Sequence, residues 1–519
     1  MDLGTLFEFA VERHPRYEAL VQGEIRLTYE QMNRQIDRVA AGLQALGIEK
    51  GDRLLLVLKN RLEMVILYWA VQKIGAIFTP INFRLSPDEI HYCVQDADAK
   101  AVVYEPVSEA PVLQATKNLK LVKIAVQGAQ GADITYEALQ EKAAERPVRP
   151  PIDDDDICLM LYTSGTTGRP KGVPRSHKNE YSAAVAHIIQ NRYEVQESTI
   201  GVMPLYHTMG MRSLLSIAFL NGKLVMIPDY DAQTVLELLD KEKITCVYLV
   251  PTIFHDMLYH PKFDSYNLSS LKKLGYAGAP MTKALTEEIF RKLKPDVFIN
   301  HYGSSEVYTF SICDYLHIKP GCAGKPGFHQ RIRVVVADPD GNATPDDVVP
   351  VGVPGEIIVD LRSNEAFQGY WNRPDATQKA IREGWYFTGD MGMIDEDGDL
   401  YVLGRVDDMI ISGGENIHPL EVEDVLAKHP KVAEVAVAGL PDPRWGEIVT
   451  AFIVPRDHSL TAEELDAYCK ESDRLSNFKR PRKYVFVRSI PKSPVGKILR
   501  RKLRNGEYEE LSLQKESAS

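Results

Sequence analysis

Short apolar runs with the character of buried strands alternate with amphipathic stretches along most of this chain. The runs "RLLLVLKN" (53–60), "KLVMIP" (223–228) and "CVYLVP" (246–251) are bounded by proline or polar residues, as strands commonly are. In "MTKALTEEIFRKL" (281–293) the apolar residues share one helical face, and Thr282 is a candidate N-cap. This alternation predicts an α/β fold with largely parallel sheets.

The pattern changes after about residue 395. "DEDGDLYVLGR" reads as a hairpin because Asp-Gly at 397–398 is a turn signal. Beyond it, "PLEVEDVLAKHP" and "TAEELDAYCKE" read as helices, whereas "VAEVAVAGL", "IVTAFIVP" and "KYVFV" read as strands. We therefore expect a large N-terminal domain over 1–404 and a small C-terminal α+β domain over 405–519.

Length and charge narrow the class of protein. A chain of 519 residues is too long for one hydrophobic core. The net charge of −11 argues against wholesale binding of nucleic acid, which needs a basic face. It leaves room for a local basic groove that holds a phosphorylated small molecule.

Cysteines and apolar segments point to a cytoplasmic protein. None of the six cysteines lies in a CxxC pair, so we expect buried free thiols. The first residues lack a basic leader followed by an apolar core. The apolar segment "MVILYWAVQKIGAIFTPI" is interrupted by Gln72, Lys73 and Gly75, which favours a buried helix running into a strand over a membrane span.

The stretch "LYTSGTTGRPKG" (161–172) has the composition of a phosphate-binding loop. Glycines let backbone amides converge on an anion, hydroxyls add donors, and Lys171 adds a charge. It is not a Walker A loop, because Pro170 and Gly172 stand where that motif has Gly and Ser or Thr. The chain also lacks a GxGxxG after a strand, so a dinucleotide site is unsupported.

The alternative for this stretch is a surface linker of small polar residues. The run "ICLMLY" just before it reads as a buried strand, which would make the loop emerge from the edge of a sheet. Ligands of α/β proteins bind at such edges, so the phosphate interpretation is favoured.

Seven motifs in order resemble the adenylate-forming superfamily, which contains acyl- and aryl-CoA synthetases, nonribosomal adenylation domains and luciferases. They span nearly the whole chain and read "YTSGTTGRPKG" (162–172), "PLYH" (204–207), "GYAGAP" (275–280), "YGSSE" (302–306), "GWYFTGD" (384–390), "LGRVDDMIISGGENIHPLEVE" (403–423) and "PKSPVGKILR" (491–500). The segment "GRVDDMIISGGENIHP", with "DPRWGE" and "FKRP" after it, is most similar to benzoate-type CoA ligases such as 4-chlorobenzoate-CoA ligases.

The resemblance implies a reaction in two steps that uses ATP, Mg²⁺ and coenzyme A. A carboxylate attacks the α-phosphorus of ATP to give an acyl-adenylate and pyrophosphate, and the thiol of CoA then displaces AMP. A carboxylate is an inert acyl donor at neutral pH, so the protein must supply charge neutralisation and positioning.

The resemblance also implies the nucleotide site. Glu306 matches the magnesium-binding glutamate, Tyr302 should stack near adenine, and Asp390 with Arg405 should hold the ribose. Ser305 replaces the usual threonine and keeps its hydroxyl. The remaining positions of the ATP and AMP site are Thr163, Ser164, Gly165, Thr166, Thr167, Gly168, Lys171, Gly278, Ala279, Pro280, Gly303 and Ser304.

Lys497 matches the adenylation lysine, and Asp407 matches the hinge about which the C-terminal domain swings between the two half-reactions. In the second orientation the segment "SGGEN" (412–416) should replace Lys497 at the active site. The positions implied for coenzyme A are Arg84, Ser412, Gly413, Gly414, Glu415, Trp445, Phe478 and Arg480. Exposed Trp and Arg at a domain edge also occur for packing reasons, and the basic run after Lys497 reads as a solvated helix face.

His207, with Lys497 and Glu306 the third catalytic candidate, matches a gate beside the substrate carboxylate. The alternative for it is a core histidine. The implied acyl pocket comprises His207, Tyr248, Tyr276, Ala277, Gly278, His301, Gly303, Val307, Tyr308 and Thr309. Tyr248 and Tyr276 would narrow it around a flat ring. His301, Tyr308 and Thr309 are more polar than a halogenated ring needs, so we expect a hydroxyl or amino substituent.

The leading hypothesis is therefore an aryl-CoA ligase, a monomer or homodimer acting on small molecules and not on nucleic acid or membranes. A medium-chain or alicyclic acyl-CoA synthetase is one alternative. A carrier-protein-dependent aryl adenylating enzyme is another, although Trp445, Phe478 and Arg480 count against it. A non-enzymatic nucleotide sensor is disfavoured by the presence of both Lys497 and Glu306.

Overall fold

A computed structural model describes residues 1–141, 146–163, 169–338, 341–412, 415–457, 459–472, 475–493 and 496–511. The chain forms two compact units. The first comprises Met1–Arg331 and Asp360–Tyr386, and the second comprises Ile332–Val359 and Phe387–Ser519. Residue 405, the expected domain boundary, lies inside the second unit. Independent movement of 405–519 is not tested by this division and stays a prediction.

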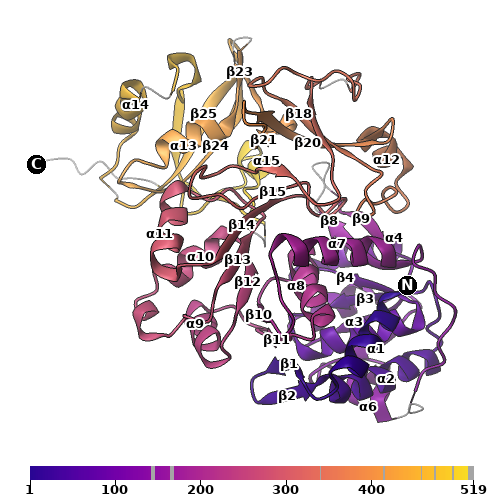
Figure 1. Ribbon diagram of the computed structural model, residues 1–519. Coiled ribbons are helices and arrows are strands. Elements are labelled where there is room, and N and C mark those ends of the chain that lie inside the picture. The colour runs from indigo at the N-terminus through magenta and orange to yellow at the C-terminus, as the bar shows by residue number, and fades with distance from the viewer. Residues whose placement is uncertain are drawn as a thin grey trace, which may run out of the picture. The chain divides into compact units, whose positions relative to one another are not determined.

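The first unit contains a seven-stranded sheet in the order β7-β6-β5-β3-β4-β8-β9, of which β3, β4, β8 and β9 are labelled in Figure 1. All neighbouring strands are parallel except the antiparallel pair β8–β9. The strands span Arg53–Val57 (β3), Ile77–Pro80 (β4), Ala99–Tyr104 (β5), Val122–Ala125 (β6), Ile134–Thr135 (β7), Ile157–Thr163 (β8) and Lys171–Ser176 (β9).

Helix α3 (Leu62–Ile74) is the buried centre of this region, because every one of its residues is buried. Two of its polar side chains are bound within the unit: Lys73 Nζ binds Asp37 Oδ1 at 2.5 Å, and Gln72 Nε2 donates to the Cys158 carbonyl. The expected buried helix running into a strand is confirmed by α3 and β4. The helices around this sheet are α1 (Leu3–Arg13), α2 (Tyr29–Ala45), α4 (Pro87–Asp96), α5 (Glu109–Ala115) and α6 (Tyr136–Glu141).

Two further sheets complete the first unit. One has the order β10-β11-β1-β2 and the other β12-β13-β14-β15-β16. Their strands span Glu18–Gln22 (β1), Ile25–Thr28 (β2), Ser198–Gly201 (β10), Lys223–Met226 (β11), Cys246–Leu249 (β12), Lys273–Tyr276 (β13), Val297–Tyr302 (β14), Ser311–Cys313 (β15) and Lys325–Pro326 (β16). The accompanying helices are α7 (His177–Gln190), α8 (Thr208–Phe219), α9 (Ala232–Lys241), α10 (Pro251–Leu258), α11 (Lys283–Leu293), α12 (Pro374–Ala380) and the 3₁₀ turn Phe263–Ser265.

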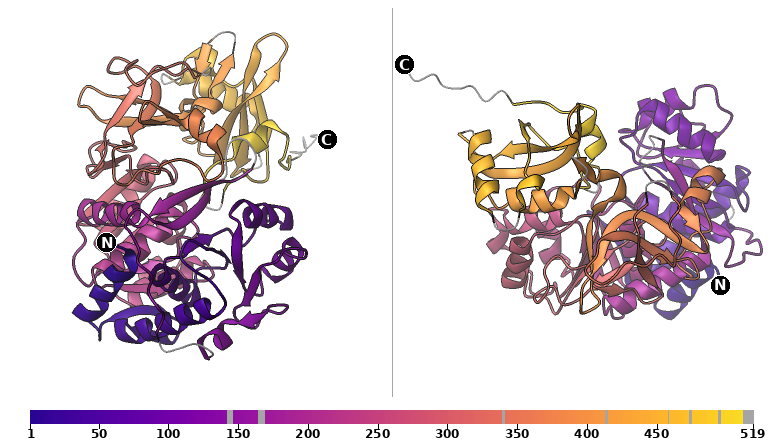
Figure 2. Two further views of the ribbon diagram at one scale, coloured as in Figure 1. Left: turned by 90° about the vertical axis from the view of Figure 1, so that its right-hand side faces the viewer. Right: turned by 90° about the horizontal axis from the view of Figure 1, so that it is seen from above.

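The second unit is built on antiparallel hairpins, and its elements from α13 onward lie together in both views of Figure 2. Strands β24 and β25 pair along their whole length, and β26 adds in parallel. The unit's strands span Ile332–Val335 (β17), Gly355–Asp360 (β18), Trp385–Ile394 (β20), Leu400–Arg405 (β21), Ile410–Ser412 (β22), Glu415–Ile417 (β23), Val432–Asp442 (β24), Gly446–Pro455 (β25) and Lys483–Phe486 (β26). Strands β18 and β20 begin or end in the first unit, where Ile381–Arg382 (β19) pairs with β20. The helices are α13 (Pro419–Leu426), α14 (Ala462–Glu471), α15 (Arg500–Arg504) and the 3₁₀ turns Val406–Asp408 (η2) and Asn477–Lys479 (η3).

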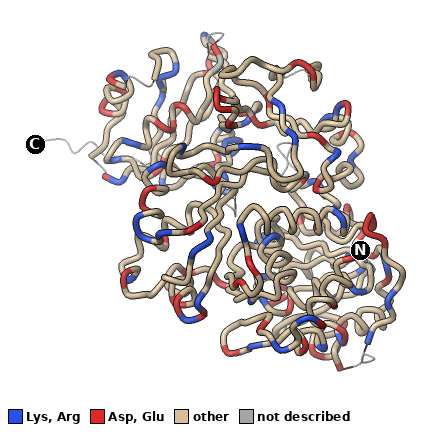
Figure 3. The backbone as a smooth tube through the Cα atoms, in the orientation of Figure 1, with Lys and Arg blue, Asp and Glu red and all other residues tan. Residues whose placement is uncertain are grey.

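The mixed α/β architecture expected from the sequence is confirmed, with parallel sheets in the first unit and an α+β body at the C-terminal end. Thr282 caps α11 by accepting a hydrogen bond from Leu285 N. All six cysteines are buried. Among the described residues, no helix is both long and apolar enough to cross a membrane. Acidic and basic residues are interspersed along the backbone (Figure 3).

Candidate active site

The phosphate-loop motif lies on the hairpin of β8 and β9. Thr163 and Lys171 are Cα partners at the end of the hairpin where the loop joins the two strands, and residues 158–161 of β8 are buried. The buried strand expected before the loop is therefore confirmed. Ser164, Gly165, Thr166, Thr167 and Gly168 lie outside the described residues. The phosphate-binding role of the loop stays a prediction, with both of its ends anchored in a sheet.

A tight turn over 303–308 follows β14 and carries Glu306. A Cβ atom at Gly303 would lie 1.5 Å from the carbonyl oxygen of Tyr308, so the turn requires glycine there. Tyr308 adopts a φ of 38°, which is rare for a bulky side chain and indicates that its surroundings hold it. The Glu306 carbonyl accepts hydrogen bonds from Phe367 N at 2.8 Å and from Arg175 Nη1 at 2.9 Å. These contacts fix the turn from two other segments.

The Glu306 carboxylate is held by a tyrosine from a distant segment. Tyr370 Oη donates to Glu306 Oε1 at 2.7 Å, and the Lys171 ammonium lies 4.1 Å from the centroid of the same ring. The ammonium is close enough for a cation–π contact. Tyr370 thereby connects the predicted phosphate-loop lysine with the predicted magnesium ligand, and sequence reasoning missed it.

A buried charge cluster lies next to this turn. Glu180 accepts from Arg175 Nε at 3.0 Å and from Arg212 Nη2 at 2.5 Å, and it is fully buried. The two guanidinium carbons lie 4.0 and 4.2 Å from the centroid of the Tyr308 ring. The Tyr308 ring therefore contacts both arginines, and these contacts contribute to its burial.

Glu306 fits a magnesium site of the kind that phosphates complete. Its side chain is 6% exposed, and no described residue donates a hydrogen bond to Oε2. Mg²⁺ takes hard oxygen ligands and is commonly held by one or two carboxylates together with substrate phosphates and water. One free carboxylate oxygen matches that requirement.

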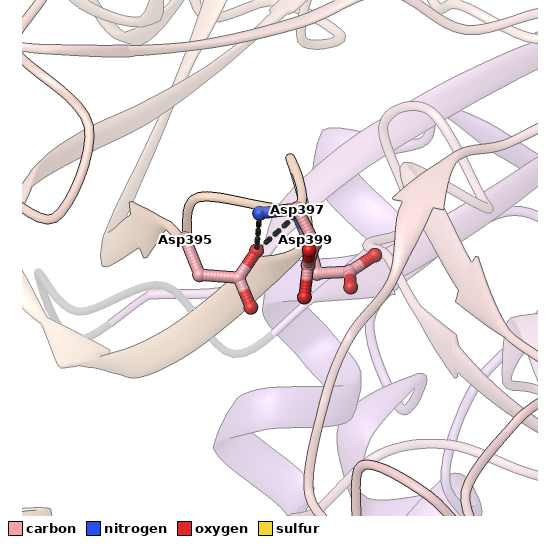
Figure 4. A group of neighbouring side chains, drawn as sticks. All are labelled: Asp395, Asp397 and Asp399. Carbon is pink, nitrogen blue, oxygen red and sulfur yellow. Dashed lines mark hydrogen bonds between the residues drawn. The ribbon is translucent and has the colours of Figure 1, made fainter.

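Besides Glu306, the described part of the chain contains one group of acidic residues whose side chains lie close enough together to hold a metal ion. This group forms a hairpin turn. Asp395, Asp397 and Asp399 gather at the β20–β21 hairpin (Figure 4). Asp395 Oδ1 accepts from Asp397 N at 3.0 Å and from Asp399 N at 2.8 Å. These bonds close the Asp-Gly hairpin that the sequence predicted, and they give the cluster a structural role.

The remaining nucleotide motifs of the first unit meet at one edge of a sheet. Strands β12, β13 and β14 are parallel, with Leu249 opposite Tyr276 and Tyr276 opposite Asn300. The segments that follow β13 and β14 therefore emerge together at the carboxyl edge, where α/β proteins bind ligands. They contain Gly278, Ala279, Pro280, Gly303, Ser304 and Ser305. The half-buried Tyr302 lies edge-on to Phe310, with ring centroids 5.1 Å apart.

The two predicted ribose residues lie in the second unit and bind each other. Asp390 and Arg405 are Cα partners across β20 and β21. Arg405 Nη1 donates to Asp390 Oδ1 at 2.7 Å and to the Thr388 carbonyl at 2.9 Å. The arginine therefore orients the carboxylate that the resemblance assigns to the ribose hydroxyls.

Lys497 lies in a short backbone loop of the second unit. Ser493 N donates to the Lys497 carbonyl at 2.8 Å, Lys497 N donates to Ser493 Oγ at 3.1 Å, and Leu499 N donates to the Pro491 carbonyl. Asp407 lies in the 3₁₀ turn η2. Ser412 and Glu415 are Cα partners across β22 and β23, whereas Gly413 and Gly414 lie outside the described residues.

The predicted coenzyme A residues are divided between the units. Arg84 is exposed and stacks on Phe83 in the first unit. In the second unit the exposed Arg482 lies 4.2 Å from the Trp445 ring centroid, and Phe478 is 44% exposed. Arg480 Nη1 instead binds Asp466 at 2.5 Å. Sequence reasoning missed Arg482, and the coenzyme A role of Arg480 stays a prediction.

The predicted acyl-pocket residues are mostly buried. His207 is half-buried at the N-cap of α8, where its Nδ1 accepts from Met209 N at 3.4 Å. Tyr248, Tyr276 and His301 belong to the three parallel strands β12, β13 and β14. The other buried members are Ala277, Val307, Tyr308 and Thr309.

A polar cluster surrounds His301. His301 Nε2 lies 3.1 Å from Asn191 Oδ1, and the His187 ring lies 5.1 Å from the His301 ring and 4.7 Å from the Tyr248 ring. Asn191 Nδ2 donates to the His187 carbonyl, which turns its oxygen toward His301. A Cβ at Gly275 would meet Tyr248 at 3.0 Å and Asn191 at 3.1 Å. Sequence reasoning missed His187 and Asn191, which lie at the end of α7.

The two imidazoles of this cluster are neutral. Burial lowers the pKa of His301 to about 3 and lowers that of His187 well below its ordinary value. His301 Nε2 therefore carries the proton that Asn191 Oδ1 accepts, which leaves Nδ1 as an acceptor. His301 Nδ1 and both His187 nitrogens have no hydrogen-bond partner among the described residues. Buried polar atoms of this kind are usually satisfied by water or a ligand.

Comparison with known proteins agrees with this geometry. The AMP-binding enzyme model matches residues 7–371, and the AMP-binding enzyme C-terminal domain model matches residues 421–497. The long-chain-fatty-acid–CoA ligase FadD13 of Mycobacterium tuberculosis is 36% identical over 510 residues, covering 97% of this chain and 98% of the relative. The 4-chlorobenzoate–CoA ligase of an Arthrobacter species is 32% identical over 513 residues, covering 96% and 95%.

A solved structure shows the same fold with ligands in place. The o-succinylbenzoate coenzyme A synthetase of Bacillus subtilis, in complex with ATP and a magnesium ion, superposes with a TM-score of 0.83. It is 28% identical to this chain, and the match covers 96% of this chain and 98% of that one.

This chain belongs to the AMP-binding enzyme family. The comparisons confirm the adenylate-forming resemblance, including its likeness to aryl-CoA ligases, and the expectation of an AMP-forming acid–thiol ligase that uses ATP, Mg²⁺ and coenzyme A. They support the acyl- or aryl-CoA ligase activity without fixing the acid, because the relatives are named for both fatty and aromatic acids.

Proposed function

We propose that the protein is an aryl-CoA ligase whose aromatic acid carries a hydrogen-bond-donating substituent, such as a hydroxyl or amino group. The observation that carries this proposal is the neutral cluster of His187, Asn191 and His301 beside Tyr248. His301 Nδ1 and the unprotonated nitrogen of His187 accept hydrogen bonds, so the cluster favours a substrate that donates one. An alkyl chain would leave these nitrogens unsatisfied at a cost of about 1–3 kcal/mol each.

In the adenylation step, the acid and ATP bind at the carboxyl edge of β12–β14. Lys171 and the loop before it hold phosphate oxygens, Asp390 and Arg405 hold the ribose, and Tyr302 stacks near adenine. Magnesium, when bound at Glu306, neutralises phosphate charge. His207 lies beside the substrate carboxylate, and Lys497 stabilises the charge that develops between carboxylate and α-phosphate.

In the thioester-forming step, the part of the chain beyond Asp407 rotates and brings Ser412–Asn416 to the acyl-adenylate in place of Lys497. Glycine at positions 413 and 414 has no side chain that could obstruct pantetheine. Trp445, Phe478 and the arginine side chains near them hold the nucleotide of coenzyme A. The stacked pair of Trp445 and Arg482 supports this assignment because it offers an aromatic face and a cation on one surface.

A fatty-acyl-CoA ligase is the second candidate. The 36% identity to FadD13, a relative named for long-chain fatty acids, favours it. The two candidates differ in the group that occupies the proposed acyl pocket. A fatty-acyl chain would have to pass Tyr248, Tyr276 and the His187–His301 pair.

A panel of carboxylic acids separates the two candidates. It would contain hydroxy- and aminobenzoates, unsubstituted and halogenated benzoates, and aliphatic acids, each scored by CoA-dependent AMP formation. We expect kcat/KM for a hydroxy- or aminobenzoate to exceed that for benzoate by about tenfold or more, since a site built to pair a polar group rejects analogues that lack it. Higher kcat/KM for octanoate or 4-chlorobenzoate would contradict the proposal.

A further inference from the structure

Arg500, the first residue of α15, is bound on three sides within the second unit. Its Nη2 donates to both carboxylate oxygens of Glu423, at 2.6 and 2.7 Å. Its Nη1 lies 3.4 Å from Asp408 Oδ2, and its Nε donates to the Val437 carbonyl at 3.0 Å. The Arg500 side chain is 10% exposed. These partners together hold the guanidinium of Arg500 in a single position.

The partners of Arg500 come from separate elements that the proposed mechanism uses. Asp408 belongs to η2 and directly follows the hinge residue Asp407. Glu423 lies on α13, which follows the β22–β23 hairpin, and it also accepts from Val437 N at 2.7 Å. Arg500 therefore joins the hinge, the helix after the 412–416 segment, and strand β24.

A second arginine of α15 reaches the same hinge. Arg504 Nη1 donates to the Asp407 carbonyl at 2.9 Å. Between the two arginines, Leu503 is fully buried and packs with Ala438 and Phe452. Helix α15 is thus attached to η2 and to the core of its own unit at once.

Lys497 lies three residues before Arg500, so the chain permits it little independent movement. Three extended residues span at most about 10 Å. The backbone bonds between Ser493 and Lys497, and the bridge between Lys492 and Ile498, shorten that reach further. The position of the Lys497 backbone is therefore set by where Arg500 is held.

We propose that Arg500 is a positioning residue for adenylation, which locks the Lys497 loop to the hinge segment 406–408 and to α13 so that rotation at the hinge is transmitted rigidly to Lys497. The three guanidinium nitrogens bind Glu423, Asp408 and the Val437 carbonyl at the same time, whereas the single nitrogen of a lysine ammonium cannot reach all three. This inference rests on the proposed role of Lys497, and the experiments below distinguish failure of one from failure of the other.

The test compares Arg500→Lys with Arg501→Lys, a matched control at the next, exposed position of the same helix. Adenylation is followed by acid-dependent exchange of pyrophosphate into ATP, and thioester formation by reaction of chemically prepared acyl-adenylate with CoA. We expect Arg500→Lys to lower kcat of adenylation by roughly ten- to a hundredfold, because a shift of about 1 Å costs that much. KM for ATP and the rate of thioester formation should stay within about threefold. Arg501→Lys should match the wild type.

Two results would overturn the proposal. Unchanged adenylation in Arg500→Lys would show that Lys497 is positioned without Arg500. Equal losses in both half-reactions would show that Arg500 serves the stability of the whole unit.

If Arg500→Lys does not fold, Asp408→Asn is informative, because it weakens the hinge contact while leaving the Glu423 pair. It should reproduce a selective loss of adenylation, and wild-type adenylation in it would overturn the proposal. Lys497→Ala, measured alongside, reports on the underlying mechanism alone, since retained adenylation there would refute the role of Lys497 whatever Arg500 does.

Discussion

Tyr370 Oη donates a 2.7 Å hydrogen bond to Glu306 Oε1, and the Lys171 ammonium lies 4.1 Å from the centre of the same tyrosine ring. The three residues come from the turn after β14, the start of β9 and a segment more than sixty positions after Glu306. If Glu306 binds magnesium and Lys171 binds phosphate, Tyr370 sets the distance between them.

Tyr370→Phe should weaken magnesium-dependent binding of ATP. The substitution removes the hydroxyl that orients Glu306 and keeps the ring beneath Lys171. A hydrogen bond to a charged group contributes about 1.5–3 kcal/mol, so KM for MgATP should rise roughly ten- to a hundredfold. Steady-state kinetics across a magnesium titration measures this. Tyr259→Phe, at an exposed position, is the control. A variant with wild-type magnesium dependence would show that Tyr370 does not orient a metal ligand.

Asp390→Asn should raise KM for ATP while preserving the fold. The amide keeps the shape of the side chain but loses the charged pair with Arg405, and it offers one acceptor oxygen where the carboxylate offers two. We expect roughly tenfold or greater weakening with ATP and a smaller effect with 2′-deoxy-ATP, which has one ribose hydroxyl fewer. An equal effect on both nucleotides would remove Asp390 from the ribose site.

His187→Phe should shift substrate preference from polar to apolar rings. The substitution replaces two unpartnered nitrogens with carbon in a somewhat larger aromatic ring. Relative kcat/KM for benzoate over a hydroxybenzoate should rise by about tenfold or more, because the lost hydrogen bond penalises only the polar substrate. His255→Phe, at an exposed position, should leave the ratio as it is. A ratio that stays constant in His187→Phe would place the cluster outside the acyl site.

The buried histidines should make the protein less stable in acid. Burial lowers the pKa of His177 to about 4 and that of His301 to about 3, against an ordinary value of 6.5. Between those values the unfolded chain binds more protons than the folded one, so stability rises with pH. The contribution is complete above pH 6.5 and is lost as pH falls toward 3.

Urea unfolding at pH 7.5 and pH 5.0 measures this loss. Each of these histidines should lower the unfolding free energy at pH 5.0 by about 2 kcal/mol relative to pH 7.5. The loss of unfolding free energy between the two pH values should therefore be smaller by that amount in His301→Gln than in the wild type. His255→Gln, which changes an exposed ring, should lose as much stability as the wild type. An identical pH dependence in all three proteins would show that His301 is not buried in its neutral form.

Local patterns predicted much of the fold. The run "ICLMLY" became β8, the interrupted apolar segment became α3 and β4, and Thr282 caps α11, because these elements depend on periodicity and capping within a few residues. The motifs around Glu306, Asp390 and Lys497 could be recognised for the same reason, because each is a contiguous segment of the sequence.

Pairings between distant segments were not predictable from the sequence. Tyr370 binds Glu306, Arg482 stacks on Trp445, and His187 approaches His301 only because the chain brings separate elements together. The contacts of Tyr308 could not be predicted either, because its ring meets Arg175 and Arg212, which lie far away in the sequence. Its place in the acyl pocket stays a prediction.

The central claim is that one lysine serves one half-reaction, and Lys497→Ala tests it most directly. The variant should lose adenylation, measured as acid-dependent exchange of pyrophosphate into ATP, by about a hundredfold or more, because the charge that develops at the α-phosphate loses its stabilising cation. The same variant, supplied with prepared acyl-adenylate and CoA, should form the thioester at close to the wild-type rate. Equal losses in the two half-reactions would contradict the account.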